Sequence, residues 1–486
     1  MKTQAPTQLS VQRGVTTLMV IVFLGIFMVI LTTVSSFALE EEKYAQALLS
    51  REQALTVAES GLEYYRWFLA HNPNNLTNGT SSPGPYPYIV NDPETGDTIG
   101  TAQITVTGKT QCNTVQWIDI VATGTAAINS NFQRTLYARY MKPSVAGYSY
   151  LLNSNVWAGS TRTINGPYYS NGGIRMDAVS NSDVSSAVAT WTCNGSFGCS
   201  PTNNSAPGVF GASAGSALWH FPATSVDFSG GIGLQLNAIK TAAQTYGLYF
   251  ATSTGTAGKR GYHFVFQSDG TINVYRVTAV TTVRSSTDGA TFSNDNGIIA
   301  TETLLGNYVL PSSCRVIFAE DNVWVEGTVK YPVTIGAADY SGSGVTPNAY
   351  LPNNIYYTTY DGSAGLTVVA DGNVFIPLNS PDIMEIHGIF VAHNGLFGRN
   401  FYTSDNAYGS DVVPSAYNSY VLQSQLTTVG TVVSNLRTGT AWSSGGATVS
   451  GYQTRVDSYD QLQALAPPPF TPSASASYQF INWDER

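Results

Sequence analysis

Residues 10–50 read SVQRGVTTLMVIVFLGIFMVILTTVSSFALEEEKYAQALLS. The stretch from Val15 to Leu39 carries no charge, and three glutamates follow it directly. At 1.5 Å per residue, a helix of this length crosses the ~30 Å hydrocarbon core of a bilayer. Lys2 and Arg13 precede the run, so the positive-inside rule places the first residues in the cytoplasm and the bulk of the chain outside.

A signal peptide and a plain membrane anchor are the alternative interpretations. A secretory signal has an apolar stretch of only about 7–15 residues, followed by a small-residue cleavage site. This run is longer, although SSFA near Ala38 resembles such a site.

The helical pattern continues beyond the apolar run. Apolar residues recur at steps of three and four, which places one stripe along a helix. The stripe consists of Tyr44, Leu48, Leu55, Ala58, Leu62, Tyr65 and Leu69. Gly61 is the weak point of this helix, and Asn72-Pro73 ends it, because the residue before a proline avoids the helical region. We therefore expect one helix from about Val15 to about Ala70, roughly 80 Å long.

Three features in order resemble the N-terminal region of PilX-type minor pilins of type IV pili. They are a short leader ending in Arg13-Gly14, the apolar run, and REQALTVAESGLEYY at Arg51–Tyr65. The resemblance implies cleavage by prepilin peptidase after Gly14, with Val15 as the new N-terminus. It also implies that the helix of residues 15–72 packs against other pilins. Met19, Leu48, Leu55, Leu62 and Leu69 are the packing residues that we expect.

Met19 departs from the major-pilin pattern. Major pilins have a glutamate at the fifth mature position, and here that position is Met19. A carboxylate in lipid is costly unless its partner is present, so its absence suggests a subunit without that contact. By resemblance, a tip or priming position is favoured, whereas a helix that merely tolerates methionine is compatible with any position.

The rest of the chain predicts β structure. Thr101–Gly108, Val115–Gly124 and Phe132–Met141 alternate apolar and polar residues, as antiparallel strands do, within a small pilin-like region at 73–143. We expect a β-solenoid at 144–465, with an insertion at about 205–310 that contains a hairpin (Tyr262–Val277) and a short helix (Gly233–Gly247). Residues 466–486 form a Pro/Ser-rich tail that we expect to be extended and partly loose.

Three segments indicate coils of a right-handed parallel β-helix. IFAEDNVWV, VVADGNVFI and FVAHNGLFG begin at Ile317, Val368 and Phe390 and share one pattern, at offsets of 51 and 22 residues. An offset near twenty suits one coil, and the longer one suits two coils with an insertion. We expect Asn and Gly at the corners and the first coils at Ser154–Ile174. This texture resembles the large minor pilins with β-solenoid ectodomains of candidate-phyla-type bacteria.

Composition and cysteines limit the remaining options. Only 11% of the 486 residues are charged and the net charge is −9, so nucleic-acid binding, which requires clustered Lys and Arg, is not expected. The four cysteines allow three pairings, and some of them could be plain buried thiols. Cys193 and Cys199 flank a short loop and are a candidate disulfide in an exported chain.

Chemical sites are weakly indicated. Glu385, His387 and His393 are candidate metal ligands, on the argument that even spacing shares one strand face, although Gly388 and Gly395 make one continuous strand doubtful. SNDNG at Ser293–Gly297 suggests a calcium site, and a turn explains the stretch equally well.

The acid pairs Glu320-Asp321 and Asp382/Glu385 suggest a glycan-cleaving β-helix enzyme, although such acids usually lie in solvated turns. Tyrosines in NGPYYSNGG and NNIYYTTYDG suit glycan or protein binding, although we expect most of the tyrosines to be ladder residues of the solenoid.

The sequence thus predicts a mostly β protein with a long N-terminal helix, a small antiparallel sheet and a β-solenoid. We expect no enzyme activity and no cofactor. The expected role is a minor pilin of the tip or priming type, made in the cytoplasmic membrane and moved to the cell surface for filament assembly and adhesion. Other pilins, prepilin peptidase and a surface glycan or host-cell receptor are the expected partners. A membrane-anchored carbohydrate-active β-helix enzyme and a secretion-system pseudopilin are the alternatives.

Overall fold

The computed structural model describes residues 12–73, 75–81, 84–232 and 235–486. The chain divides into two compact units. The helix–sheet unit comprises Met1–Thr107, Asp119–Arg139 and Asn482–Arg486, and the β-helix unit comprises Gly108–Ile118 and Tyr140–Ile481. The second unit is therefore inserted, in sequence, within the first.

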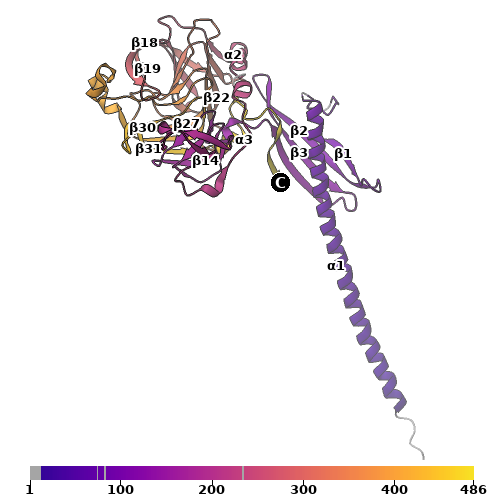
Figure 1. The fold of residues 1–486 in the computed structure, drawn as a ribbon. Coiled ribbons are helices and arrows are strands. Elements are labelled where there is room, and N and C mark those ends of the chain that lie inside the picture. The colour runs from indigo at the N-terminus through magenta and orange to yellow at the C-terminus, as the bar shows by residue number, and fades with distance from the viewer. Residues whose placement is uncertain (1–11, 74, 82–83, 233–234) are drawn as a thin grey trace, which may run out of the picture. The chain divides into compact units, whose positions relative to one another are not determined.

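The N-terminal helix is a single element. Helix α1 runs from Gln12 to His71 without interruption, as Figure 1 shows. The backbone N–H of Asn72 still donates to the carbonyl of Phe68, and Pro73 follows, so the helix ends where the sequence predicted. The expectation of one helix, apolar in its first half, is confirmed.

The C-terminal half of α1 packs on a five-stranded sheet in the order β1-β2-β3-β4-β32. The strands are β1 (Tyr86–Asn91), β2 (Thr98–Gln111), β3 (Thr114–Ala126), β4 (Gln133–Met141) and β32 (Gln479–Glu485). The three predicted strands correspond to β2, β3 and β4. Strands β1 and β32 were not predicted, and β32 corrects the expectation of a loose tail, because Gln479–Glu485 completes the sheet beside β4.

Small residues bring the helix close to this sheet. A Cβ atom added at Gly61 of α1 would lie 2.7 Å from the Cβ atom of Ala102 in β2. One added at Gly124 of β3 would lie 2.1 Å from the backbone oxygen of Ala54. Ala58 is fully buried in the same contact. The Ala58–Gly61 step therefore has a local structural reason: it allows the helix backbone to approach the sheet.

The β-helix unit is built from parallel strands stacked coil upon coil, as expected. One ladder contains, in spatial order, β16 (Leu248–Phe250), β20 (Val316–Ala319), β22 (Pro332–Ala337), β25 (Gly365–Ala370), β27 (Ile383–Ala392), β29 (Leu422–Ser434), β5 (Tyr150–Leu152), β8 (Tyr168–Ser170), β11 (Val184–Ser186) and β15 (Trp219–His220). Its inward residues pack in one continuous hydrophobic core.

Further strands complete the coils. They are β17 (Gly261–Phe266), β21 (Asn322–Val329), β23 (Ala349–Tyr350), β24 (Ile355–Tyr357), β26 (Val374–Phe375), β28 (Phe397–Gly398), β31 (Ala447–Ser458), β7 (Arg162–Asn165), β10 (Val179–Ser180), β6 (Val156–Ala158), β9 (Ile174–Met176) and β14 (Val209–Phe210). Antiparallel hairpins project from the stack: β18 (Thr271–Ser286) with β19 (Phe292–Val309), β12 (Thr190–Cys193) with β13 (Asn204–Pro207), and β30 (Ala441–Ser444) with β31.

The repeat segments have the predicted spacing. Val368 pairs directly with Phe390, so the 22-residue offset is one coil. Ile317 pairs with Ile335, and Ile335 pairs with Val368, so the 51-residue offset is two coils. Both interpretations are confirmed.

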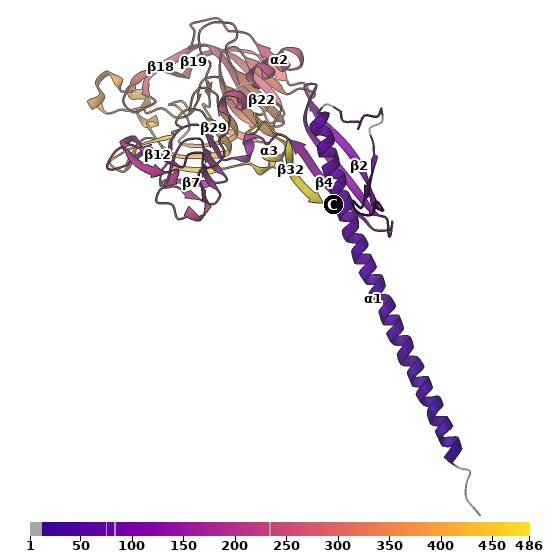
Figure 2. The ribbon, with the colours of Figure 1, turned by 45° about the vertical axis from the view of Figure 1, so that its right-hand side comes forward.

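The order of the coils differs from the prediction. Tyr150 of β5 pairs with Val432 of β29, so the coils that come first in sequence stack on those that come last. Ser154–Ile174 is therefore in the middle of the stack rather than at its start. In Figure 2 the early strand β7 and the late strand β29 are drawn in the same part of the unit. Parallel pairing between segments about 280 residues apart has no local sequence signal, and this explains the error.

Asparagines hold one corner of the stack, as expected. The Oδ1 atom of Asn322 accepts the N–H of Asn348 at 2.8 Å, and Asn348 accepts the N–H of Asn373 at 2.8 Å. Asn373 accepts the N–H of Leu396 at 2.9 Å. The ladder satisfies backbone donors that a bend would otherwise leave without partners.

The outer face of the long ladder is covered. Helix α2 (Gln235–Tyr246) packs Leu236 and Ile239 against it. Phe470 packs there too, and Thr471 hydrogen-bonds Thr367 at 2.7 Å, so the proline-rich segment lies on the sheet and is not loose. The predicted short helix is confirmed as α2, and α3 (Gln461–Leu465) precedes the proline-rich segment.

The predicted insertion at 205–310 is only partly separate from the stack. Strands β15, β16 and β17 pair in parallel with coil strands, whereas α2 and the β18–β19 hairpin are additions to the coils. The hairpin predicted around Asp269-Gly270 is confirmed as β17 and β18.

Both disulfides lie in the β-helix unit. Cys193 is bonded to Cys199, as the sequence suggested, and Cys112 is bonded to Cys314. The second bond links the β2–β3 turn to the residues that lead into β20. Its 202-residue separation explains why no sequence pattern indicated it.

Candidate functional site

The first half of α1 is the most exposed apolar surface of the described chain. Every side chain from Val15 to Leu39 is exposed, and the most apolar 18-residue window of the helix has no buried part. By length and composition alone, α1 can cross a membrane. An apolar surface of this size requires cover from lipid or from other helices.

The predicted packing residues separate into two groups. Met19 and Leu48 are 58% and 51% exposed, and Leu55 is half-buried. Leu62 and Leu69 are buried within the single chain, so the expectation that they pack against neighbouring subunits is wrong. The apolar stripe on the helix indicates burial, but the pattern cannot tell which partner provides it.

The predicted processing site lies at the start of the helix. Gly14 and Val15 belong to the first turns of α1, both exposed, and the backbone of Arg13 is also helical. Residues 1–11 of the proposed leader lie outside the described residues.

The three candidate metal ligands do not converge. His387 and Glu385 are paired, with Nε2 2.6 Å from Oε1, whereas His393 faces Asp371 at 3.2 Å. His387 and His393 are six residues apart along and just beyond β27, a spacing of about 20 Å in an extended strand. The even spacing was therefore a wrong argument for a shared ion. Among residues 12–73, 75–81, 84–232 and 235–486, no three His, Cys, Asp or Glu side chains are grouped to hold a metal.

The adjacent acids Glu320 and Asp321 are structural and buried, not solvated turns as expected. Glu320 pairs with Lys240 at 2.6 Å and accepts the hydroxyl of Tyr249. Asp321 accepts from Arg260 Nε at 2.9 Å and from Ser253. In the other acid pair, Asp382 and Glu385, the carboxylate of Asp382 already accepts hydrogen bonds from the N–H and the hydroxyl of Ser424.

The candidate calcium segment is also filled by protein groups. Asp295 is buried and accepts hydrogen bonds from the N–H of Gly297 and from the side chains of Asn400 and Tyr402. Burial raises the pKa of Asp295. A raised pKa together with protein donors on the carboxylate is the reverse of an open, ion-ready site, so the SNDNG stretch is explained by internal hydrogen bonds.

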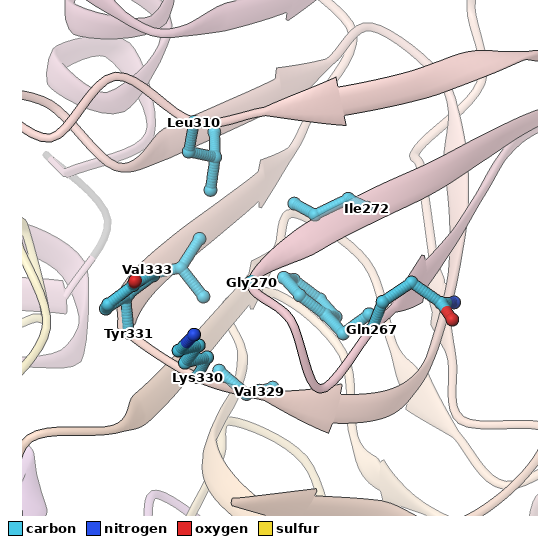
Figure 3. A pocket seen from close by; sticks show the side chains of 9 residues that line it. Gln267, Gly270, Ile272, Leu310, Val329, Lys330, Tyr331 and Val333 are labelled. Atoms are coloured by element: carbon cyan, nitrogen blue, oxygen red, sulfur yellow. The ribbon is translucent and has the colours of Figure 1, made fainter. Parts of the chain in front are cut away.

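The pocket in Figure 3 offers apolar contacts. Ile272 of β18, Leu310 directly after β19 and Val333 of β22 project into it. Lys330, at its edge, donates to the backbone oxygen of Asp269 at 3.1 Å and is already engaged. The lining contains no carboxylate, histidine or cysteine, and its titratable side chains are those of Lys330 and Tyr331.

A buried histidine lies between two carboxylates, and no sequence pattern had indicated it. His263 in β17 is 7% exposed. Its Nδ1 atom lies 2.9 Å from Glu302, and its Nε2 atom lies 3.4 Å from Glu326. Burial alone would lower the pKa of His263, but the two glutamates raise it to about 9. The acids come from β19 and β21, and only the strand register brings them together.

His263 is expected to make stability depend on pH. Its folded pKa of about 9 exceeds the ordinary value of 6.5, so its contribution is complete below pH 6.5 and disappears as the pH rises to 9. The shift corresponds to a loss of about 3 kcal/mol in the free energy of unfolding. Denaturant titrations at pH 6 and pH 9 measure it. The variant His263→Gln should show a smaller difference between the two pH values, and an equal difference would contradict the assignment.

No protein-family model and no curated protein sequence matches this chain. Among solved structures, the chain is similar to the competence-associated pilin ComZ from Thermus thermophilus, at 12% identity and a TM-score of 0.27. The alignment covers 90% of this chain and 97% of that one. A TM-score this low carries no argument about fold or function.

Proposed function

We propose that this chain is a minor subunit of a type IV pilus-like filament. The first half of α1 holds it in the cytoplasmic membrane before assembly and packs among other pilin helices afterwards. One observation carries the proposal: α1 is a single helix whose apolar first half is wholly exposed and whose second half is fixed to a sheet. A plain anchor has no need for a rigid continuation of this kind, whereas a packing subunit requires one.

The tip or priming position and the adhesive role are the finer parts of the proposal. Met19 is exposed where a major pilin has its glutamate, and this favours a subunit without that neighbour contact. The β-helix unit is large and carries its own core, which suits it to recognition at the cell surface. We also propose that the chain catalyses no reaction and needs no cofactor, in line with the internal partners of Glu320, Asp321 and Asp295.

Mass analysis of the mature N-terminus tests the processing step. We expect the loss of residues 1–14 and a methylated Val15 in protein recovered from sheared filaments. A retained leader, or cleavage near Ala38, would contradict the pilin assignment.

Substitutions at exposed apolar residues test packing. Leu48→Asp should lower recovery in the sheared-filament fraction about tenfold or more, because an unpaired carboxylate would enter a helix–helix contact. Leu48 is 51% exposed in the free subunit, so folding and membrane retention should be unchanged. Val179→Asp is the matched control, since Val179 is 64% exposed in the β-helix unit. Equal recovery of both variants would argue against helix packing, and periplasmic retention of filaments would favour a secretion pseudopilus.

A further inference from the structure

Two stretches that the sequence marked for different reasons meet on one outer face of the β-helix. The aromatic stretch NNIYYTTYDG contains β24, and the Glu385/His387 pair lies on β27. Ile355 pairs with Ile386 in parallel register, which sets Tyr356 beside His387 on the neighbouring coil. Residues that were predicted to bind a metal and residues that were predicted to bind a partner therefore belong to one cluster.

Three tyrosine rings surround the imidazole of His387. The ring centroids of Tyr356, Tyr357 and Tyr360 lie 6.2, 5.3 and 5.2 Å from that of His387. His387 is buried, and its Nε2 atom is 2.6 Å from a carboxylate oxygen of Glu385. The histidine thus fills the centre of the cluster, which leaves no cage for a cation between the rings.

The outer surface of the cluster is open. Tyr360 is 63% exposed, Tyr356 is 36% exposed, and the Glu385 side chain is 40% exposed. Tyr357 is buried beneath them and accepts the backbone N–H of Leu366 through its hydroxyl, so the base is fixed. The rings of Tyr356 and Tyr360 are tilted by 47° and 50° to the imidazole, and together with the carboxylate at their edge they form an exposed aromatic surface, here called the platform.

The charge around the platform is negative. Burial first, and then the charge of Glu385, raise the pKa of Tyr356. Burial also raises the pKa of Tyr357, and the charge of Asp460 acts in the same direction. A carboxylate edge accepts hydrogen bonds from hydroxyl groups and repels anions. The Nδ1 atom of His387 is buried without a hydrogen-bond partner in the described structure. An unpaired buried polar atom of this kind lowers the free energy of unfolding.

We propose that Tyr356, Tyr360 and Glu385 form a binding site for an uncharged glycan. The C–H face of a sugar ring stacks on the tyrosine rings, and its hydroxyl groups donate to the Glu385 carboxylate, which His387 holds in place. Glycans with sialic or uronic acids are excluded by like charge. The adhesive purpose of this site rests on the proposed function, because the site would give a surface filament its adhesive contact. Glycan binding itself does not depend on the filament.

Binding of the purified full-length chain in detergent to an oligosaccharide panel tests the site. The panel contains uncharged gluco-, manno- and chito-oligosaccharides with sialylated and uronic-acid members. We expect binding to an uncharged member only. Tyr360→Ala should weaken it about two- to tenfold through lost stacking, and Glu385→Gln about tenfold or more through a lost charge-assisted hydrogen bond. Tyr246→Ala, at an exposed tyrosine that ends α2, is the matched control and should bind normally.

The outcomes separate this site from the filament proposal. Binding of acidic members alone, binding to no member, or equal binding by all variants would overturn the site, as would capture of a deglycosylated polypeptide through the same tyrosines. Filament recovery of Tyr360→Ala should equal that of the unsubstituted chain. Loss of leader cleavage or filament recovery in the unsubstituted chain, with glycan binding intact, would overturn only the filament proposal.

Discussion

Replacing Asp457 by alanine is expected to lower the free energy of unfolding of the β-helix unit by about 3–5 kcal/mol. Asp457 is buried on β31 and accepts hydrogen bonds from Arg162 Nε at 2.5 Å and from the hydroxyl of Tyr150 at 2.9 Å. The guanidinium of Arg162 also lies 4.1 Å over the ring of Tyr150. Without Asp457, a buried cation would lose its counter-charge, and burial of an unpaired ion is among the most destabilising changes known in proteins.

The position of this ion pair gives it a particular role. Asp457 belongs to the last strand of the stack in sequence, whereas Tyr150 and Arg162 belong to its first coils. The contact thus joins segments about 300 residues apart, at the place where early coils stack on late ones. We expect the pair to specify that register in addition to stabilising it.

A double variant distinguishes the two contributions. Arg162→Met combined with Asp457→Leu removes both charges and should recover most of the lost stability, because apolar residues can replace a buried pair at little cost. Tyr150→Phe removes one hydrogen bond and should cost about 1 kcal/mol. Denaturant unfolding measures the free energy of unfolding of the three variants and of the unsubstituted chain. A loss below 1 kcal/mol for Asp457→Ala would contradict the assignment.

Local patterns were sufficient for α1, for strands β2, β3 and β4, and for the spacing and corners of the coils. The uncharged run and the apolar stripe predicted α1, because helical periodicity depends only on residues three and four positions apart. The coil spacing followed from Ile317, Val368 and Phe390, because each coil repeats the same inward pattern. The asparagine corners followed from the turn preference of Asn.

The remaining features depend on pairings that no short pattern encodes. Leu62 and Leu69 have the spacing of a buried stripe, yet only the folded chain shows that they are covered by its own residues. The Cys112–Cys314 bond and the order of the coils depend on contacts across hundreds of residues. The sequence indicated the tyrosines and the Glu385/His387 pair separately but not their contact, because Tyr356 and Glu385 lie on different coils.

Replacing Gly124 by alanine is expected to destabilise the helix–sheet unit by about 3 kcal/mol, at the upper end of the usual cost of overpacking. Its Cβ atom would lie 2.1 Å from the backbone oxygen of Ala54 and 2.5 Å from the backbone nitrogen of Ala58. Both atoms belong to the α1 backbone and cannot move aside as a side chain would. The helix would have to move away from β3, and the buried contacts around Ala58 would loosen.

Gly61→Ala provides a graded comparison in the same interface. Its Cβ atom would meet the side chain of Ala102 at 2.7 Å, and the helix would gain about 1 kcal/mol of intrinsic propensity. We therefore expect a smaller loss than for Gly124→Ala. Gly147→Ala is the control, since no atom lies within 4 Å of its added Cβ, and its stability should be unchanged. Thermal unfolding followed by circular dichroism measures the three variants. Equal losses at Gly61 and Gly124 would mean that the close backbone approach does not determine how α1 sits on its sheet.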